Sequence, residues 1–119
     1  MDRPKPRGLT RLLRALVSSA KGLAGAYRGE AAFRQELLLA ALVVPAGLYL
    51  GRSGIERLLL VAPMFLVLVV ELLNSAVEAT VDRIGLEHHA LSGLAKDLGS
   101  AAVLLSLGLL ALAWVLVLW

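Results

Sequence analysis

The stretch that decides the fold is residues 55–82, IERLLLVAPMFLVLVVELLNSAVEATVD. After Glu56 and Arg57, every position up to Val70 is apolar, and the stretch then turns polar at Glu71 with no glycine or proline before Gly85. These residues predict one helix of about 29 residues, roughly 43 Å long at 1.5 Å per residue. Because a hydrocarbon core is only about 30 Å thick, we expect the last third of this helix to leave the membrane.

The composition of the chain places it in the membrane class. Of its 119 residues, 59% are hydrophobic and 18% are charged. A soluble domain has roughly 45–50% apolar residues and about 25% charged residues. A disordered chain is poor in apolar residues, so the composition excludes that class too. The chain has no cysteine, which excludes a disulfide scaffold, a thiolate zinc site and a thiol nucleophile. At about 20 residues per span, we expect a single all-α domain over residues 1–119 with three spans, and any chemistry must come from the spans and their margins.

Two further spans flank the deciding stretch. The first is expected over about 31–50, where the apolar run Leu37–Leu50 follows a polar cluster and ends at the turn Gly51–Gly54. The last is expected over about 95–119, and its Trp114 and Trp119 are expected to lie toward the membrane interface.

The amino-terminal region predicts a helix on the membrane surface. Residues 1–8 contain two prolines among charges and predict a loose tail. Residues 9–28 predict an amphipathic helix. Its apolar stripe is Leu9, Leu12, Leu13, Leu16, Ala20 and Leu23, and its polar face is Arg11, Arg14, Ser18 and Lys21. A basic amphipathic helix lies in the interface, and the interrupting arginines argue against a signal peptide.

The distribution of cations predicts the orientation. Seven of the twelve Lys and Arg residues lie in residues 1–28, so the positive-inside rule places the amino terminus in the cytoplasm. Three spans then place the segment 82–96 inside and the carboxyl terminus outside. The net charge of +3 is thus concentrated where anionic lipids and solutes are met, and it is too sparse and too membrane-bound to indicate nucleic-acid binding.

The polar end of the deciding stretch forms one helical stripe. Glu71, Asn74, Ser75, Glu78 and Asp82 are spaced i, i+3, i+4, i+7 and i+11, which places them on a single face. Two other polar clusters, within 30–36 and 96–100, lie at the same predicted depth. We therefore expect three clusters to converge at the cytoplasmic membrane surface, where ionisable groups in spans are functional by default.

Three interpretations of these clusters are open: helix packing through hydrogen bonds, ion or proton translocation, and a metal–phosphate site. Carboxylates one turn apart repel unless a cation, proton or partner lies between them, and oxygen ligands without cysteine favour Mg²⁺. Their position at one membrane face argues against a transporter. No P-loop, G-x-G-x-x-G or protein-kinase motif is present, but carboxylates with Lys and Arg can supply the positioning and charge neutralisation that phosphoryl transfer needs.

Three blocks of sequence resemble the bacterial diacylglycerol kinase family: EAAFRQE at 30–36, VELLNSAVEATVDR at 70–83 and AKDLGSAA at 95–102. The resemblance implies a homotrimeric three-span enzyme of the bacterial inner membrane that uses MgATP to phosphorylate diacylglycerol to phosphatidic acid, recycling it for phospholipid synthesis. The first block favours diacylglycerol kinases over undecaprenol kinases. A kinase for undecaprenol or another lipid alcohol is the alternative, and a small ion-coupled transport or assembly protein is a further one.

The resemblance also implies residue roles. Glu71 is the expected general base of a direct in-line transfer, Glu30 and Glu78 are the expected Mg²⁺ ligands, and Asn74 supports them. The expected nucleotide contacts are Arg11, Ser18, Glu30, Glu78, Glu87, His88, His89, Lys96 and Asp97. The expected lipid contacts are Arg11, Ala15, Leu16, Val17, Ser18, Ser19, Ala20, Ala24, Gly25, Ala26, Tyr27, Ala32, Phe33, Arg34, Gln35, Glu36, Tyr49, Arg57, Glu71 and Ser100.

Several of these residues also have simpler interpretations. The histidine pair fits an exposed turn, and Tyr27 and Tyr49 fit interfacial anchoring. Arg57 fits a lipid headgroup or a contact with Glu56.

Overall fold

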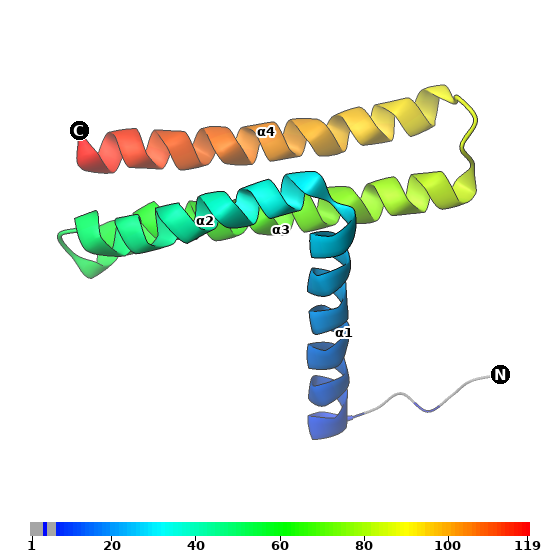
Figure 1. Ribbon diagram of the computed structural model, residues 1–119, viewed down its shortest axis with the longest axis horizontal. Coiled ribbons are helices and arrows are strands. Elements are labelled where there is room, and N and C mark those ends of the chain that lie inside the picture. The colour runs from blue at the N-terminus through cyan, green and yellow to red at the C-terminus, as the bar shows by residue number, and fades with distance from the viewer. Residues whose placement is uncertain (1–3, 5–6) are drawn as a thin grey trace.

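The chain folds into four helices. The computed structural model describes Pro4 and residues 7–119, and most of the expected tail (residues 1–3 and 5–6) lies outside the described residues. In the described part the elements are α1 (Gly8–Gly29), α2 (Ala31–Leu50), α3 (Gly54–Ile84) and α4 (Ala90–Leu118), with no strand. Helices α2, α3 and α4 run alongside one another, and α1 leaves them crosswise (Figure 1).

Helices α2, α3 and α4 are long and apolar enough to cross a membrane, which confirms the predicted all-α membrane fold. Helix α3 continues unbroken from its apolar part through the polar stripe. Both α3 and α4 extend past the corner between α1 and α2 (Figure 1), as expected for helices longer than the hydrocarbon core.

Helix α4 begins at Ala90, five residues before the start expected near residue 95. The reason is a local cap: the Nδ1 atom of His89 accepts a hydrogen bond from the backbone N–H of Leu91 at 3.1 Å, which satisfies one of the free donors of the first turn. This first turn was not predicted from the sequence, because Ser92 and Gly93 interrupt the apolar pattern there.

A tight hairpin joins α2 to α3. Ser53 caps α3 by accepting a hydrogen bond from the N–H of Glu56 at 3.1 Å, and Arg52 pairs with the Glu56 carboxylate at 3.2 Å. The Nε atom of Arg57 donates to the carbonyl oxygen of Leu48 at 3.1 Å. A Cβ at position 51 would lie 2.8 Å from the backbone nitrogen of Arg57, so only glycine allows the two helix ends to approach this closely.

The core lies along one face of α3. Leu60, Met64 and Val67 are fully buried there, and Met64 and Val67 cluster with Leu110 of α4 and flanking residues of α2. The indole N–H of Trp114 donates to the carbonyl oxygen of Leu60 at 2.9 Å. Trp114 therefore ties α4 to α3 from a half-buried position, and its place toward the membrane interface stays a prediction.

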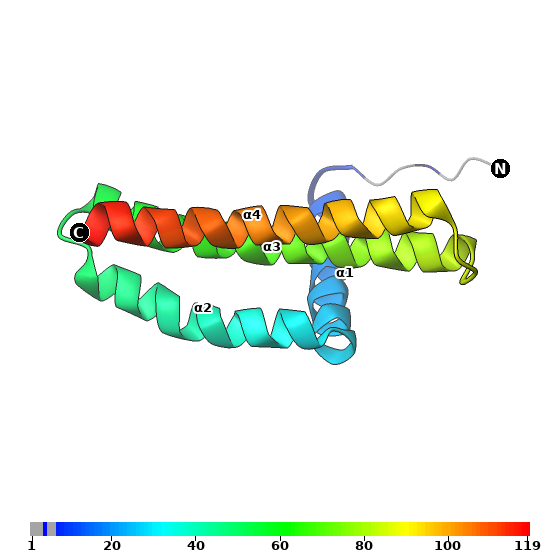
Figure 2. The same ribbon diagram turned by 90° about the horizontal axis from the view of Figure 1, so that it is seen from above.

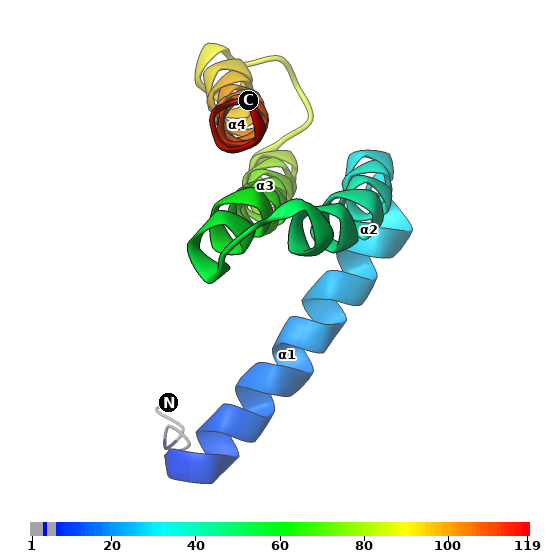
Figure 3. The ribbon, with the colours of Figure 1, turned by 90° about the vertical axis from the view of Figure 1, so that its left-hand side faces the viewer.

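The apolar face of α1 is left uncovered by the described part of the chain. Leu9, Leu12, Leu13 and Leu16 are all exposed, and only Ala26 near the end of the helix is buried. Figure 3 shows α1 extending away from the other three helices, and in the view of Figure 2 it passes behind α3 and α4. An amphipathic helix set crosswise to the spans fits the membrane interface.

Candidate active site

The corner between α1 and α2 is formed by Glu30. Its backbone is extended (φ −122°, ψ 108°), and its N–H donates to the carbonyl oxygen of Ala26 at 2.9 Å. The Nη1 atom of Arg34 donates to the carbonyl oxygens of Tyr27 at 2.7 Å and Arg28 at 3.2 Å. Arg34 thus caps the end of α1, a role that sequence reasoning missed, although a cation just after a predicted helix break is a signal for it.

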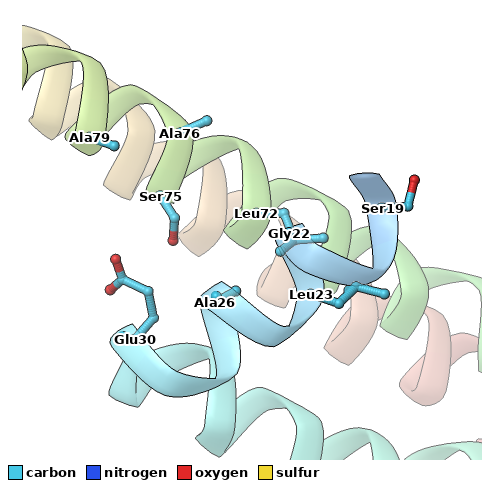
Figure 4. Close-up of a pocket in the computed structure, with 11 residues that line it drawn as sticks. Ser19, Gly22, Leu23, Ala26, Glu30, Leu72, Ser75, Ala76 and Ala79 are labelled. Atoms are coloured by element: carbon cyan, nitrogen blue, oxygen red, sulfur yellow. The ribbon is translucent and has the colours of Figure 1, made fainter. Parts of the chain in front are cut away.

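A groove of about 610 Å³ lies between α1 and α3. Small residues create the space, and at one end the side chains of Glu30 and Ser75 face each other across it (Figure 4). The lining residues are Ser19, Gly22, Leu23, Gly25, Ala26, Gly29 and Glu30 from α1 and the corner, and Leu72, Ser75, Ala76 and Ala79 from α3. Of these, Ser19, Gly25, Ala26 and Glu30 were expected site residues.

Sequence reasoning missed the other small residues of this groove. Gly22 and Gly29 of α1 and Ala76 and Ala79 of α3 recur at helical spacing, which could have indicated two faces that leave space between them. The groove is predominantly apolar with a polar end, a character that suits a lipid with a polar head.

Glu71 lies where the buried face of α3 turns polar. It continues the series Leu60, Met64 and Val67 at the next helical position, and it is only 4% exposed. The carboxyl group of Glu36 on α2 lies next to it, and the buried Oε2 atom of Glu36 has no hydrogen-bond partner among the described residues. Two carboxylates this close repel each other unless a proton or a cation lies between them, so the pair is suited to taking up a proton.

The rest of the polar stripe is incompletely satisfied. The Nδ2 atom of Asn74 donates to Glu78 Oε1 across a long 3.5 Å, whereas the buried Oδ1 atom of Asn74 and the buried Oγ atom of Ser75 have no hydrogen-bond partner among the described residues. Side chains that served only to pack helices would satisfy one another. The buried Ser75 oxygen borders the groove, where a bound ligand would satisfy it.

A second polar region lies beyond the stripe, at the α3–α4 connection. The ammonium group of Lys96 pairs with the carboxylate of Asp82 at 2.8 Å, which links α4 to α3. Next to this pair is a pocket of about 150 Å³. It is lined by Val81, Asp82, Gly85, Leu86, Glu87, His88, His89, Ser92, Gly93 and Lys96, and so gathers four of the expected nucleotide contacts.

Other expected site residues lie apart from the groove. Arg11 and Ser18 are exposed on α1, and Ser18 borders a separate hollow with Arg14 and Lys21. Asp97 and Ser100 are exposed on α4. Phe33 is only 1% exposed and packs within the chain.

Tyr49 and Arg57 lie at the opposite end of the helices from Glu71. Arg57 precedes Glu71 by fourteen residues of α3, a separation of about 21 Å along the axis, and its guanidinium group holds Leu48. Tyr49 is highly exposed. The expected lipid contacts therefore extend through most of the membrane thickness.

The oxygen-bearing side chains of this site suit a metal ion that is held partly by the protein and partly by a substrate. Among the described residues, no three Asp, Glu or His side chains gather closely enough to hold a metal ion by themselves. Mg²⁺ is typically held by one or two carboxylates together with phosphate oxygens, so the carboxylates of this site are compatible with it.

These features define a class: an all-α integral membrane protein with an oxygen-rich site at one end of its spans. Residues 17–118 match the family described as prokaryotic diacylglycerol kinase. The diacylglycerol kinase of Escherichia coli K12 is 49% identical over 112 residues, covering 94% of this chain and 92% of the relative. That of Pseudomonas aeruginosa is 50% identical over 111 residues (93% and 90%), and that of Haemophilus influenzae is 46% identical over 110 residues (92% and 93%).

The chain therefore belongs to the prokaryotic diacylglycerol kinase family and is a lipid kinase. This membership confirms the resemblance seen in the three sequence blocks and removes the transport or assembly alternative.

Proposed function

We propose that the protein transfers the γ-phosphoryl group of ATP to the primary hydroxyl of diacylglycerol, producing phosphatidic acid and ADP and returning diacylglycerol to phospholipid synthesis. The observation that carries the proposal is the place of Glu71, a buried carboxyl group at the level where the apolar face of α3 becomes polar. At this level a lipid hydroxyl held in the membrane meets phosphates from the aqueous side.

Glu71 acts as the general base in this proposal. Its carboxylate accepts the proton of the lipid hydroxyl, the hydroxyl oxygen attacks the γ-phosphorus in line, and the bond from that phosphorus to the ADP oxygen breaks. The carboxyl group of Glu36 lies next to Glu71 and supports this role, because two neighbouring carboxylates favour the uptake of a proton. No phosphoenzyme is needed, because phosphoryl transfer depends mainly on positioning and charge stabilisation.

Glu30 and Glu78 would hold Mg²⁺, and Asn74 would order Glu78 through its amide. A bound Mg²⁺ neutralises negative charge on the transferring phosphates. Glu30 approaches from the α1–α2 corner and Glu78 from α3, so each supplies one oxygen-bearing side chain from a separate element.

Nucleotide contacts would come from the α3–α4 connection and the basic face of α1. Lys96, Asp97, Glu87 and the His88–His89 pair surround the end of the helix pair, and Arg11 and Ser18 lie on α1. Lys96 now pairs with Asp82, and a phosphate group would compete for the same ammonium group.

The lipid would lie along the groove and the outer faces of the helices. The apolar groove beside α1 suits the glycerol end of the substrate. Tyr49 and Arg57, about 21 Å away along α3, would contact only the far part of an acyl chain.

The proposed setting is the bacterial inner membrane, with the amino terminus in the cytoplasm. The apolar faces of α1, α2 and α4 remain exposed in the single chain, and Asp97 and Ser100 are exposed on α4 and do not line its groove. We propose a homotrimer in which the bilayer and neighbouring subunits cover these faces.

A phosphoryl-transfer assay with labelled ATP in detergent micelles tests the proposed substrate. We expect rapid label incorporation with diacylglycerol and little with undecaprenol or without lipid. If label is incorporated faster into undecaprenol or another lipid alcohol, that lipid is the substrate and diacylglycerol is not. If the rate of ATP hydrolysis does not change when any of these lipids is added, the proposed lipid phosphorylation is wrong.

A further inference from the structure

Gly99 of α4 directly faces the side chain of Asn74 on α3. A Cβ atom at position 99 would overlap the Oδ1 atom of Asn74 and would lie 3.1 Å from its Cγ atom. Real Cβ atoms do not approach other atoms as closely as this overlap requires. The amide of Asn74 therefore occupies space that any other residue at position 99 would fill.

This contact holds an amide that has few other partners. The Oδ1 atom of Asn74 is buried and accepts no hydrogen bond among the described residues. The hydrogen that glycine carries in place of Cβ points toward this oxygen, so the contact has the form of a weak Cα–H···O interaction. At its other end, the amide donates through Nδ2 to Glu78.

Helix α4 thus contacts α3 one turn before Glu78 and one turn after it. Gly99 meets Asn74, one turn before Glu78, and Lys96 meets Asp82, one turn after it. Lys96 and Gly99 are three residues apart, so they share one face of α4. This face sets the depth at which α4 packs against the polar stripe.

We propose that Gly99 is a positioning residue for the kinase reaction, because the backbone of α4 at this position fixes the amide of Asn74 and through it the carboxylate of Glu78. The inference rests on the proposed function, in which Glu78 holds the metal and phosphate. A side chain at 99 displaces the amide and turns the carboxylate away from its working direction.

Gly99→Ala tests this inference, with Gly108→Ala as the matched control. Gly108 lies on the same helix and has no atom within 4 Å of an added Cβ. We expect Gly108→Ala to behave like the unchanged protein. For Gly99→Ala we expect kcat/KM to fall by about tenfold to a hundredfold, the range that a displacement on the order of 1 Å produces, together with a higher Mg²⁺ requirement.

Two further measurements separate positioning from packing. Thermal stabilisation by Mg²⁺ with a non-hydrolysable ATP analogue reports binding without turnover, and we expect it to be reduced in Gly99→Ala. In an Asn74→Ala background the space is free, so Gly99→Ala should add little to either defect. A packing role alone would lower the melting temperature of Gly99→Ala and leave its Mg²⁺ response unchanged.

The outcomes distinguish the two proposals. If Asn74→Ala and Glu78→Gln leave turnover and the Mg²⁺ response unchanged, the proposed metal site is wrong. If those variants are impaired but Gly99→Ala matches Gly108→Ala, the inference about Gly99 alone is wrong. Should Gly99→Ala fail to fold, the double variant decides: recovery of the fold with the Mg²⁺ response of Asn74→Ala supports the inference, and no recovery overturns it.

Discussion

The side chain of Glu71 combines two requirements that usually conflict. It is buried at the end of the apolar core face, yet in the proposed reaction it takes a proton from the substrate. A buried carboxylate is costly unless it is paired or takes up a proton, and the carboxyl group of Glu36 lies next to it. In the proposed reaction this position lets a base meet a membrane substrate without opening the core to water.

Replacing Glu71 with glutamine tests this role at the scale of one residue. The amide keeps the size of the side chain but cannot act as a base, so we expect turnover to fall by about 10²-fold or more, with nucleotide binding and melting temperature largely retained. Glu56→Gln, at the opposite end of α3, is the control and should retain turnover. Near-normal turnover in Glu71→Gln would remove Glu71 from the mechanism.

Glu30 and Glu78 give a second prediction at this scale. If both hold one Mg²⁺, each single change to glutamine should raise the Mg²⁺ concentration needed for half-maximal activity. The double variant should lose little more than the worse single variant, because residues that act as a unit are not additive. Activity titrated against Mg²⁺ for the four proteins measures this.

The contrary outcome for the same pair is also definite. Additive losses of thermal stability with an unchanged Mg²⁺ curve would mean that both residues serve packing. If both single variants show the same dependence of activity on Mg²⁺ as the unchanged protein, Glu30 and Glu78 are not the metal ligands. This conclusion does not depend on the result for Glu71.

At the scale of the element, α1 depends on its carboxyl end for its position. Its buried residue, Ala26, lies near that end, and Arg34 holds the end by donating to the carbonyl oxygens of Tyr27 and Arg28. The remainder of α1 presents its apolar face outward. The helix can therefore form one wall of the groove without contributing to the core.

Removal of α1 tests this division of roles. A chain that begins at Ala31 keeps all three spans and the core residues of α3, so we expect it to insert into membranes with its helix content preserved. It loses Glu30 and the α1 wall of the groove, and we expect kinase activity to be abolished. Insertion is followed by membrane fractionation and circular dichroism, and full activity in the shortened protein would refute the role of α1.

At the scale of the whole molecule, the two ends of the bundle differ in character. The α3–α4 connection lies at one end, and the α2–α3 turn and the carboxyl terminus lie at the other (Figure 1). The cations of residues 1–28 predict that the end with the α3–α4 connection is cytoplasmic. This orientation would bring the candidate nucleotide residues to the compartment that holds ATP.

Single cysteines test the orientation directly, because the chain has none of its own. Arg52→Cys lies in the α2–α3 turn and Leu86→Cys in the α3–α4 connection, and both native side chains are exposed. In intact spheroplasts we expect a membrane-impermeant maleimide to label Arg52→Cys, and to label Leu86→Cys only after permeabilisation. The reverse pattern would invert the topology.

Sequence alone was sufficient to predict the membrane class, the three spans, the amphipathic helix and the polar stripe from Glu71 to Asp82. These properties depend on hydrophobicity and on the 3.6-residue period, both of which are local to one helix. It also carried the three blocks that resemble the kinase family, because those blocks are contiguous in the chain.

Only the tertiary structure decided which residues meet across helices. Four contacts depend on how each helix is rotated and shifted against its neighbours. Glu36 lies next to Glu71, and Arg34 donates to the last carbonyl oxygens of α1. Trp114 donates to Leu60, and Asn74 packs against Gly99. Apolar periodicity determines which face of a helix is buried but not which turn of the neighbouring helix it meets. That choice follows from the shapes of side chains in contact, and small residues such as Gly99 act there through the space they leave.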